Sequence, residues 1–308
     1  MDAHTMNSDM TSKVLEAVAK TGYPLELQIA SVASRAGWTP FHAIQYADAE
    51  TKVHRELDLL IYKQINERRI EMRISCKSSI NKQFVFFNID RRNYIPFGDI
   101  KCTPVVADVE PSEAVRNALI SLPMFNEPLE AVNYTVVSGN NPDRNSRSLL
   151  HEALMSVLAC VHYRLIPAHL LLDERGSVYL FVVVLKAPMF NFSLDSSTGE
   201  GIVKETPYAH WRGKFSMPDH YHQMQVLNPE GRRVPLANVM YWFGDKIHVE
   251  ILRDTYFGEY LQIVEAGFNA LTPNQLRLFG KPWRAEHFPK IVGPPPPIKP
   301  RRRQMRTR

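Results

Sequence analysis

Two extended runs joined by a short polar connection constrain the fold more than any other part of the chain. The first run is "VHRELDLLIYK" (53–63) and the second is "IEMRISCKSS" (70–79), with "QINERR" (64–69) between them. Both runs mix apolar and polar residues with the alternation that is typical of strands. Because so short a connection allows only a local reversal, the sequence predicts two antiparallel neighbours in one sheet.

Alternation along these two strands assigns their side chains to faces. In the first strand we expect two opposite sets, namely Leu57, Leu59 and Ile61 against Glu56, Asp58 and Leu60. In the second strand we expect one polar set opposite an apolar one, namely Glu71, Arg73, Ser75 and Lys77 against Met72, Ile74 and Cys76. Pairing in register would then bring Asp58 toward Lys77 and leave Cys76 in the core.

The rest of the chain predicts a mixed α/β architecture. A helix should begin near Pro24 and end at Gly37, with an apolar face made of Leu25, Ile29, Val32 and Ala36. A second helix is expected over 148–165 and a short one over 111–121. Further strands are expected at 38–47, 83–89, 168–173, 178–187 and 189–195, the third and fourth forming a hairpin, and short strands within 200–289. This order predicts an α+β sandwich, a central mixed β-sheet flanked by helices.

The basic side chains are concentrated at the C-terminal end. The 308 residues include 37 Lys and Arg against 32 Asp and Glu, and residues 290–308 hold seven of the basic ones and no acid. The remainder is close to neutral and does not resemble a generally basic nucleic-acid binder. We expect one domain over 1–290, with its motifs at 21–90, and an extended Pro-rich tail over 291–308. Candidate phosphate contacts in the tail are Arg301, Arg302, Arg303, Arg306 and Arg308.

Hydropathy and cysteine content limit the cellular compartments in which we expect the protein. The longest apolar run, "YLFVVVL" (179–185), is too short to cross a bilayer, and the first residues lack a signal-peptide pattern. The 3 cysteines, Cys76, Cys102 and Cys160, have neither metal-site spacing nor the even number of a disulfide framework. We therefore expect a protein of the reducing cytoplasm that has no membrane partner.

The acid and the lysine of the paired strands indicate phosphodiester chemistry. A hard cation such as Mg²⁺, with Mn²⁺ as an alternative, prefers carboxylate and backbone carbonyl oxygens. Asp58 and the carbonyl of Cys76 would supply such ligands, and Lys77 would orient or activate the attacking water. Hydrolysis of a phosphodiester requires positive charge at the phosphate and an activated water, which these groups would provide.

At this point the sequence resembles the PD-(D/E)XK nucleases, the restriction endonuclease-like superfamily. The resemblance rests on "TGYPLEL" (21–27), "RELDLL" (55–60) and "ISCKSS" followed by "FVFF" (74–87), in this order and spacing. It implies a restriction endonuclease-like sandwich and a metal-dependent DNA endonuclease, in prokaryotic (phage) defence, as a homodimer or in a multi-subunit complex. It also implies that Glu26, an acid on the first helix, helps to hold the metal.

Ser75 departs from the pattern of this superfamily, which has an acid two residues before the lysine. In one interpretation the acid has moved, and Asp90, Glu56 or Glu26 replaces it as a metal ligand. In a second, the site binds metal weakly and cuts slowly. In a third, the chain is a catalytically inactive pseudo-nuclease that binds nucleic acid or a protein. The sequence leaves these three interpretations open.

Overall fold

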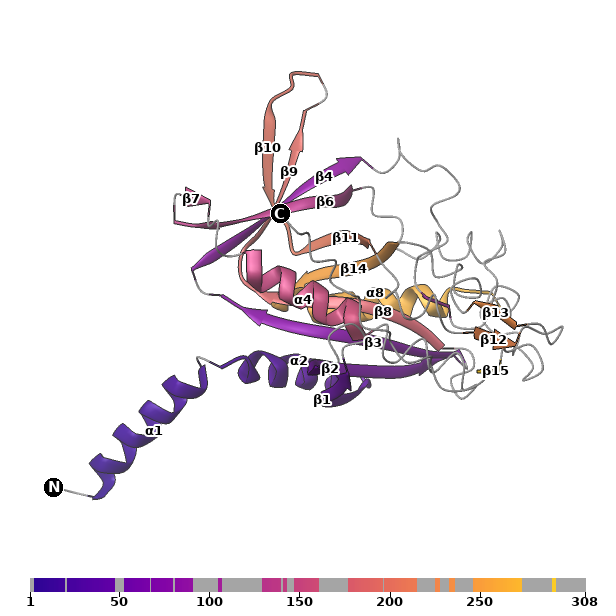
Figure 1. Cartoon of the computed structure of the whole chain (residues 1–308). Coiled ribbons are helices and arrows are strands. Elements are labelled where there is room, and N and C mark those ends of the chain that lie inside the picture. Colours follow the sequence, from indigo (N-terminus) through magenta and orange to yellow (C-terminus); the bar gives the residue numbers. More distant parts are fainter. Residues whose placement is uncertain are drawn as a thin grey trace, which may run out of the picture.

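A large mixed β-sheet with helices on both faces forms the centre of the molecule (Figure 1). The computed structural model describes residues 3–19, 21–47, 53–66, 68–79, 81–90, 105–106, 129–139, 141–142, 147–160, 177–195, 197–214, 225–227, 233–235, 246–272 and 290–291. Helix α1 (Ala3–Ala19) extends away from the sheet, and the hairpin of β9 and β10 projects on the opposite side. Within these residues, no helix has the length and apolar character needed to cross a membrane.

The main sheet has a spatial order that differs from the order of the chain. The order is β1 (Thr39–Ala47), β2 (His54–Ile65), β3 (Arg68–Ser78), β8 (Ser177–Lys186), β14 (Lys246–Arg253), β11 (Tyr208–Lys214), β6 (Leu129–Ser138), β4 (Lys82–Asp90), β9 (Met189–Leu194) and β10 (Gly201–Glu205). Strands β1, β2 and β3 are antiparallel neighbours, whereas β3, β8 and β14 are parallel. Parallel strands are usually covered on both faces, which explains why β8 reads as an almost continuous apolar run.

Shorter strands complete the two sheets. Strand β5 (Val105–Val106) pairs with β8, and β7 (Asn141–Pro142) pairs with β6. A separate sheet contains β13 (Arg233–Pro235), β12 (Gln225–Leu227) and β15 (Lys290–Ile291). Ile291, the first residue of the expected tail, therefore belongs to a strand. Residues 292–308, including the five candidate arginines, lie outside the described part of the chain.

Helix α2 (Tyr23–Arg35) forms and ends where the sequence predicts. Pro24 lies in its first turn, where backbone amides have no acceptor within the helix, so the missing N–H of proline breaks no helical hydrogen bond. Gly37 follows the C-cap with a φ of 78°. The amide of Gly37 donates to the carbonyl of Ser34, and that of Trp38 donates to the carbonyl of Ala33. These two bonds are the Schellman arrangement, which uses glycine's freedom to adopt a positive φ. The helix therefore stops one residue before the turn into β1.

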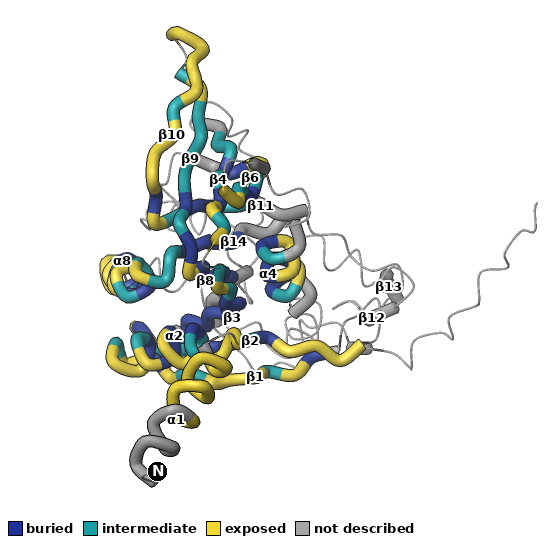
Figure 2. Tube along the Cα trace, turned by 90° about the vertical axis from the view of Figure 1, so that its left-hand side faces the viewer, coloured by how far each residue is buried: buried dark blue, intermediate teal, exposed yellow. Residues whose placement is uncertain are grey.

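Two hydrophobic cores lie on opposite faces of the sheet. The first core joins α2 and α8 (Phe257–Asn269) to β3 and β8 through Ile29, Ile74, Val182 and Phe257. The second joins α4 (Arg147–Cys160) to the sheet through Leu150, Leu154, Val183 and Ile251. Buried segments follow the middle of the sheet between these helices (Figure 2). Alternate residues of β8 enter different cores, so both faces of this strand are apolar.

Most predicted elements that fall on described residues are present. The structure confirms the mixed α+β class and the helices near 24–36 and 148–160. The two strands predicted at 53–63 and 70–78 are antiparallel neighbours as expected, but within these ranges they pair only over 59–63 and 70–74. It also confirms strands at 38–47, 83–89, 178–187 and 189–195. The expected strand at 168–173 and the helix at 111–121 lie outside the described residues. Strand β8 has β3, β14 and β5 as its described partners.

One facing prediction is wrong. Leu57 packs in the α4 core, whereas Leu59 and Ile61 pack in the α2 and α8 core. The alternation of β2 therefore breaks at Asp58. The register of β1 with β2 omits Asp58 and its opposite residue, Ala43, which has a φ of 54°. A non-glycine residue in the left-handed region costs backbone energy, and it marks a local distortion of the strand pair beside Asp58.

Candidate functional site

Strands β2 and β3 separate at Asp58. Their pairing runs from Ile65 beside Arg68 to Leu59 beside Ile74 and stops there. Beyond that point β2 continues against β1, and β3 continues against β8 as far as Ser78. We call this divergence the fork and define it by Asp58 on β2 and by Ser75, Cys76 and Lys77 on β3. A fork in a sheet leaves main-chain groups without a ladder partner, so side chains must satisfy them.

Asp58 supplies the missing partner at the fork. Its Oδ2 atom accepts a hydrogen bond of 2.6 Å from the Cys76 amide and one of 3.0 Å from the Ser75 hydroxyl. Ser75 is fully buried beneath α4, which packs on β3. Both bonds go to an acid and are therefore stronger than bonds between neutral groups. Asp58 thus holds β2 to β3 where the ladder ends.

Ser75 allows the arrangement to be stable with Asp58 as the acid that accepts both hydrogen bonds. A hydroxyl can donate to Asp58, whereas an ionised glutamate at position 75 could only accept. Two carboxylates at a buried position would repel each other unless a proton or a cation lay between them. Ser75 therefore removes the need for a cation to neutralise a second acid on β3.

Glu26 and Glu56 add negative charge beside the fork. Glu26 lies in the first turn of α2 and is partly buried. Burial raises the pKa of the Glu26 carboxyl, and the charges of Asp58 and Glu56 raise it further, while Lys77 opposes them. Glu56 is exposed, and its Oε2 accepts a hydrogen bond of 2.7 Å from Gln45. Three carboxylates and one ammonium group, from α2, β2 and β3, therefore act on one another electrostatically.

Lys77 and Cys76 have different environments on the same strand. Lys77 is half-buried, and no hydrogen bond or ion pair joins it to another described residue. The Cys76 side chain is buried in the α2 and α8 core, and burial raises the pKa of its thiol well above the usual value. A thiol of this kind is a poor nucleophile. Cys76 contributes its main chain to the fork, and the bond that the structure provides comes from its amide.

Asp90, the remaining predicted metal ligand, does not lie near the fork. Asp90 is the last residue of β4, whose first residue, Lys82, follows the end of β3. Strand β4 is separated from β3 by β8, β14, β11 and β6, so the fold does not bring Asp90 to the fork. Within the described residues, no group of three or more His, Cys, Asp or Glu side chains is arranged to hold a metal ion.

A buried ion pair on β3 lies on the same face as Ser75. Nη2 of Arg73 lies 2.5 Å from Oε1 of Glu71, and Nη2 of Arg69 lies 3.1 Å from Oε2 of the same acid. Arg73 and Glu71 are almost fully buried. The sequence predicts their common face, although it does not indicate that they pair with each other. Glu71 therefore faces two guanidinium groups, which offset the cost of burying its charge.

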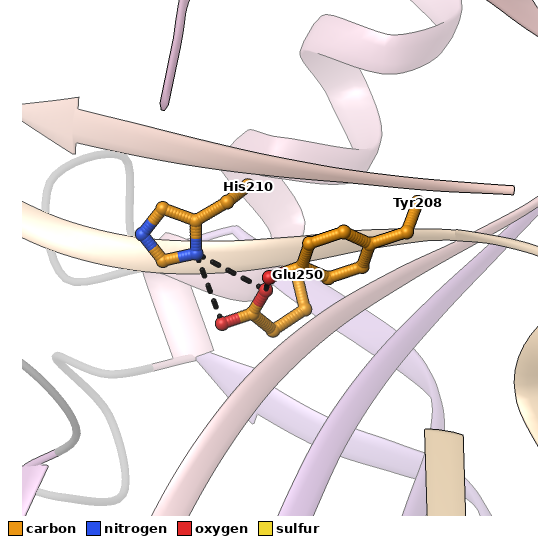
Figure 3. A network of polar contacts seen from close by, with 3 residues as sticks. All are labelled: Tyr208, His210 and Glu250. Atoms are coloured by element: carbon orange, nitrogen blue, oxygen red, sulfur yellow. Dashed lines mark hydrogen bonds and ion pairs between the residues drawn. The ribbon is translucent and has the colours of Figure 1, made fainter. Parts of the chain in front are cut away.

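A second polar group lies on β11 and β14 and was missed by the sequence reasoning (Figure 3). Glu250 accepts a hydrogen bond of 2.5 Å from the Tyr208 hydroxyl, and both its oxygens lie 3.1 Å from Nδ1 of His210. His210 and Glu250 are buried, and β11 places His210 directly opposite Glu250. The only sequence signal was a histidine in one strand and a glutamate in another. That signal does not identify a partner 40 residues away.

Compared with protein-family models, with curated proteins and with solved structures, the chain gives no match. The resemblance to the PD-(D/E)XK nucleases therefore rests on its motif residues.

Proposed function

We propose that the fork is the catalytic centre of a metal-dependent endonuclease that hydrolyses phosphodiester bonds in DNA. The observation that carries the proposal is the grouping of Glu26, Asp58 and Lys77, three residues of separate motifs, around a break in strand pairing. Strained or perturbed groups in such places are more frequent at functional sites than elsewhere. The motif order of the PD-(D/E)XK nucleases gives the same three residues.

The donor set fits a hard cation. The pKa of Glu26 is raised in part by Asp58 and Glu56, and a divalent cation would relieve that repulsion. Asp58, Glu26 and the Cys76 carbonyl would hold the ion, with Glu56 as a further acid within electrostatic reach. Because Oδ2 of Asp58 already accepts two hydrogen bonds, its Oδ1 is the oxygen better placed to serve a cation. When bound, the ion would neutralise the phosphate and lower the pKa of a water.

The protein's own residues would have separate tasks in this mechanism. Lys77 would place positive charge beside the scissile phosphate and orient the attacking water. Ser75 and the Cys76 amide would fix the Asp58 carboxylate by their hydrogen bonds. The arginines of 301–308 would add contacts to phosphates that do not depend on base sequence.

The test is cleavage of supercoiled plasmid and linear DNA with Mg²⁺, with Mn²⁺ and with EDTA. We expect cleavage that requires the metal, and a fall of at least about 100-fold in rate for Asp58→Asn and for Lys77→Ala. Lys204→Ala is the matched control, because Lys204 is exposed on β10, far from the fork in the sheet order. Thermal unfolding gives a second readout, since a bound metal should raise the Tm of the wild type and not of Asp58→Asn.

One observation favours a second candidate function, a pseudo-nuclease that binds nucleic acid or a protein without cutting. Ser75 and the Cys76 amide satisfy an Asp58 oxygen without any cation. In that case the wild type is inert, and Ser75→Glu rebuilds the acid that the superfamily pattern expects. Cleavage by Ser75→Glu alone would support the second candidate. If neither protein cuts DNA or RNA with Mg²⁺ or Mn²⁺, the catalytic proposal fails.

A further inference from the structure

Helix α1 has an apolar face that is exposed along its described length. The helix extends from the start of α2 away from the sheet (Figure 1, Figure 2). Every side chain that the structure describes in α1, over residues 10–18, is exposed. Among the described residues, 12 large hydrophobic side chains are exposed, and half of them lie between residues 10 and 27, namely Met10, Val14, Leu15, Val18, Tyr23 and Leu27. Apolar side chains gathered in this way mark an interaction surface, whereas singly scattered ones do not.

The spacing of these side chains places them on one side of the helix. Met10, Val14 and Val18 follow one another at intervals of four residues, and Leu15 lies three residues before Val18. Residues at these intervals are neighbours on a helix surface. The amide and the hydroxyl of Thr21 both donate to the carbonyl of Val18, which ends α1 in a tight turn before α2. The apolar stripe therefore reaches the end of the helix.

The sequence of α1 does not favour a helix that stands alone. Seven of its first ten residues are His, Thr, Asn, Ser or Asp, which are weak helix formers. Helices of about this length are only marginally stable in water, and in proteins their stability comes mainly from packing of the apolar face. A surface that covers the stripe of α1 would supply this stability.

The charges of α1 indicate the kind of surface that fits. Residues 10–18 carry one base, Lys13, and one acid, Glu16, so this part of the helix has no net charge. Helices that bind anionic membranes or nucleic acids are instead rich in Lys and Arg. An apolar stripe with balanced charges suits the surface of another protein.

The same two charges make the helix complementary to itself. In an antiparallel pair with a two-fold axis between Val14 and Leu15, Lys13 of each copy comes opposite Glu16 of the other. Val14 and Leu15 then lie at the centre of the pair. An interface of this isologous kind needs one surface that is complementary to its own copy, as found in most two-fold dimers.

The exposed area is large enough for a weak dimer. The six apolar side chains between residues 10 and 27 have exposed fractions of 45–65%. At about 150 Å² for a fully exposed large side chain, they offer roughly 500 Å² in each copy. Two copies would bury roughly 1,000 Å², the lower limit for a specific interface.

We propose that α1 binds α1 of a second copy of this chain, antiparallel about a two-fold axis between Val14 and Leu15. The start of α2 in one copy, with the exposed Tyr23 and Leu27, then lies beside the N-terminal half of α1 in the other. The proposal does not depend on the fork, because the observations that carry it concern other residues.

The test is sedimentation velocity of the full chain over a range of protein concentrations. We expect a dimer with a Kd in the micromolar range, and a rise of at least about tenfold in that Kd for Leu15→Glu, because this variant places two acids at the centre of the pair. Met155→Glu is the control. Met155 is also an exposed large hydrophobic residue, but it lies on α4, so the Kd should not change.

A charge exchange identifies the partner as a second α1 in the antiparallel direction. Lys13→Glu and Glu16→Lys each place like charges opposite one another, and at low salt each should raise the Kd about fivefold. A mixture of these two variants should form a heterodimer with the affinity of the wild type, because every acid then faces a base.

Three results would overturn the proposal. They are a wild type that is monomeric at every concentration, a folded Leu15→Glu that dimerises like the wild type, and charge variants that form no heterodimer when mixed. Far-UV circular dichroism and the Tm show whether each variant keeps its fold. A monomeric wild type that binds vesicles of phosphatidylcholine and phosphatidylserine would also overturn the proposal, and would assign the stripe to a membrane surface.

Discussion

Asp58 at the fork and Glu250 on β14 are both carboxylates that hold two donors, yet their surroundings are opposite in character. Glu250 is buried, and its partners are side chains on the adjacent strand. Asp58 is partly exposed, one of its partners is a main-chain amide, and two further acids act on the same region. The network around Glu250 is complete as it stands, whereas the fork carries uncompensated negative charge. A structural role suits the first carboxylate, and the attraction of a cation suits the second.

The largest expected effect is a difference in the free energy of unfolding between a variant of the Glu250 network and a variant of the fork. Glu250→Leu should lower the free energy of unfolding by about 3 kcal/mol, because it removes the carboxylate that accepts from the half-buried Tyr208 hydroxyl and contacts the buried His210. Glu26→Gln should leave stability unchanged or raise it by roughly 0.5 kcal/mol, because the charge it removes is repelled by its neighbours. Urea unfolding at pH 7 measures both. Similar losses in the two variants would contradict the contrast.

The second prediction concerns the hydrogen bonds of Asp58. Asp58→Ala should cost about 2 kcal/mol, since the Ser75 hydroxyl and the Cys76 amide both lose their acceptor. Asp58→Asn keeps an oxygen that can accept these bonds and should cost about 1 kcal/mol or less. The comparison is made by urea unfolding in EDTA. Equal losses would mean that charge, rather than hydrogen bonding, joins β2 to β3.

The third prediction concerns Ser75. Ser75→Ala should cost about 1.5 kcal/mol, the low end of the range for one hydrogen bond to a charged acceptor. Ser75→Glu should cost more than Ser75→Ala in EDTA, because it buries a second acid beside Asp58. Mg²⁺ should restore part of the lost stability in Ser75→Glu and none of it in Ser75→Ala. A variant that is equally stable with and without Mg²⁺ would argue against a cation site at the fork.

The smallest effect is on the pH dependence of stability. The pKa of Glu26 is raised in the folded state, so the folded protein binds more protons than the unfolded chain between the two pKa values. The Glu26 contribution therefore favours the folded state below its unfolded pKa, near 4.5, and is lost as the pH rises through the folded pKa. Glu26→Gln should remove this component from the pH profile of urea unfolding. An identical slope in both proteins would show that burial and the neighbouring acids do not raise the pKa of Glu26.

Local sequence predicted the residues of the fork, although not the divergence itself, because they occupy adjacent strands of one hairpin. The alternation of β3 gave the common face of Ser75 and Lys77, and the motif order brought in Glu26. The break at Asp58 could not be read from the sequence, because it depends on Ala43 in the opposite strand.

The network of Tyr208, His210 and Glu250 could not be predicted from the sequence in the same way. His210 and Glu250 are 40 residues apart in the chain and meet only because β11 and β14 are neighbours in the sheet. No short motif records such an order, because it depends on crossovers between distant segments. The overall class was accessible from periodicity, whereas the sheet order was not.

The divergence of β2 from β3 also has a consequence for local unfolding. Past Asp58, the segment 54–57 pairs with β1 alone, and the Tyr46 hydroxyl reaches α4 through the carbonyl of Ser156. This ribbon has no third strand among the described residues, and Gln45 and residues 54–56 are exposed, while Tyr46 and Leu57 are buried in the α4 core. A ribbon with so few buried residues is less stable than the middle of the sheet. Amide hydrogens of 44–47 and 54–57 should therefore exchange with solvent through an opening that costs much less than global unfolding, while those of β8 report the whole domain. Asp58 lies at the boundary between these two cooperative units. One carboxylate therefore marks the position in the sheet at which local unfolding should stop.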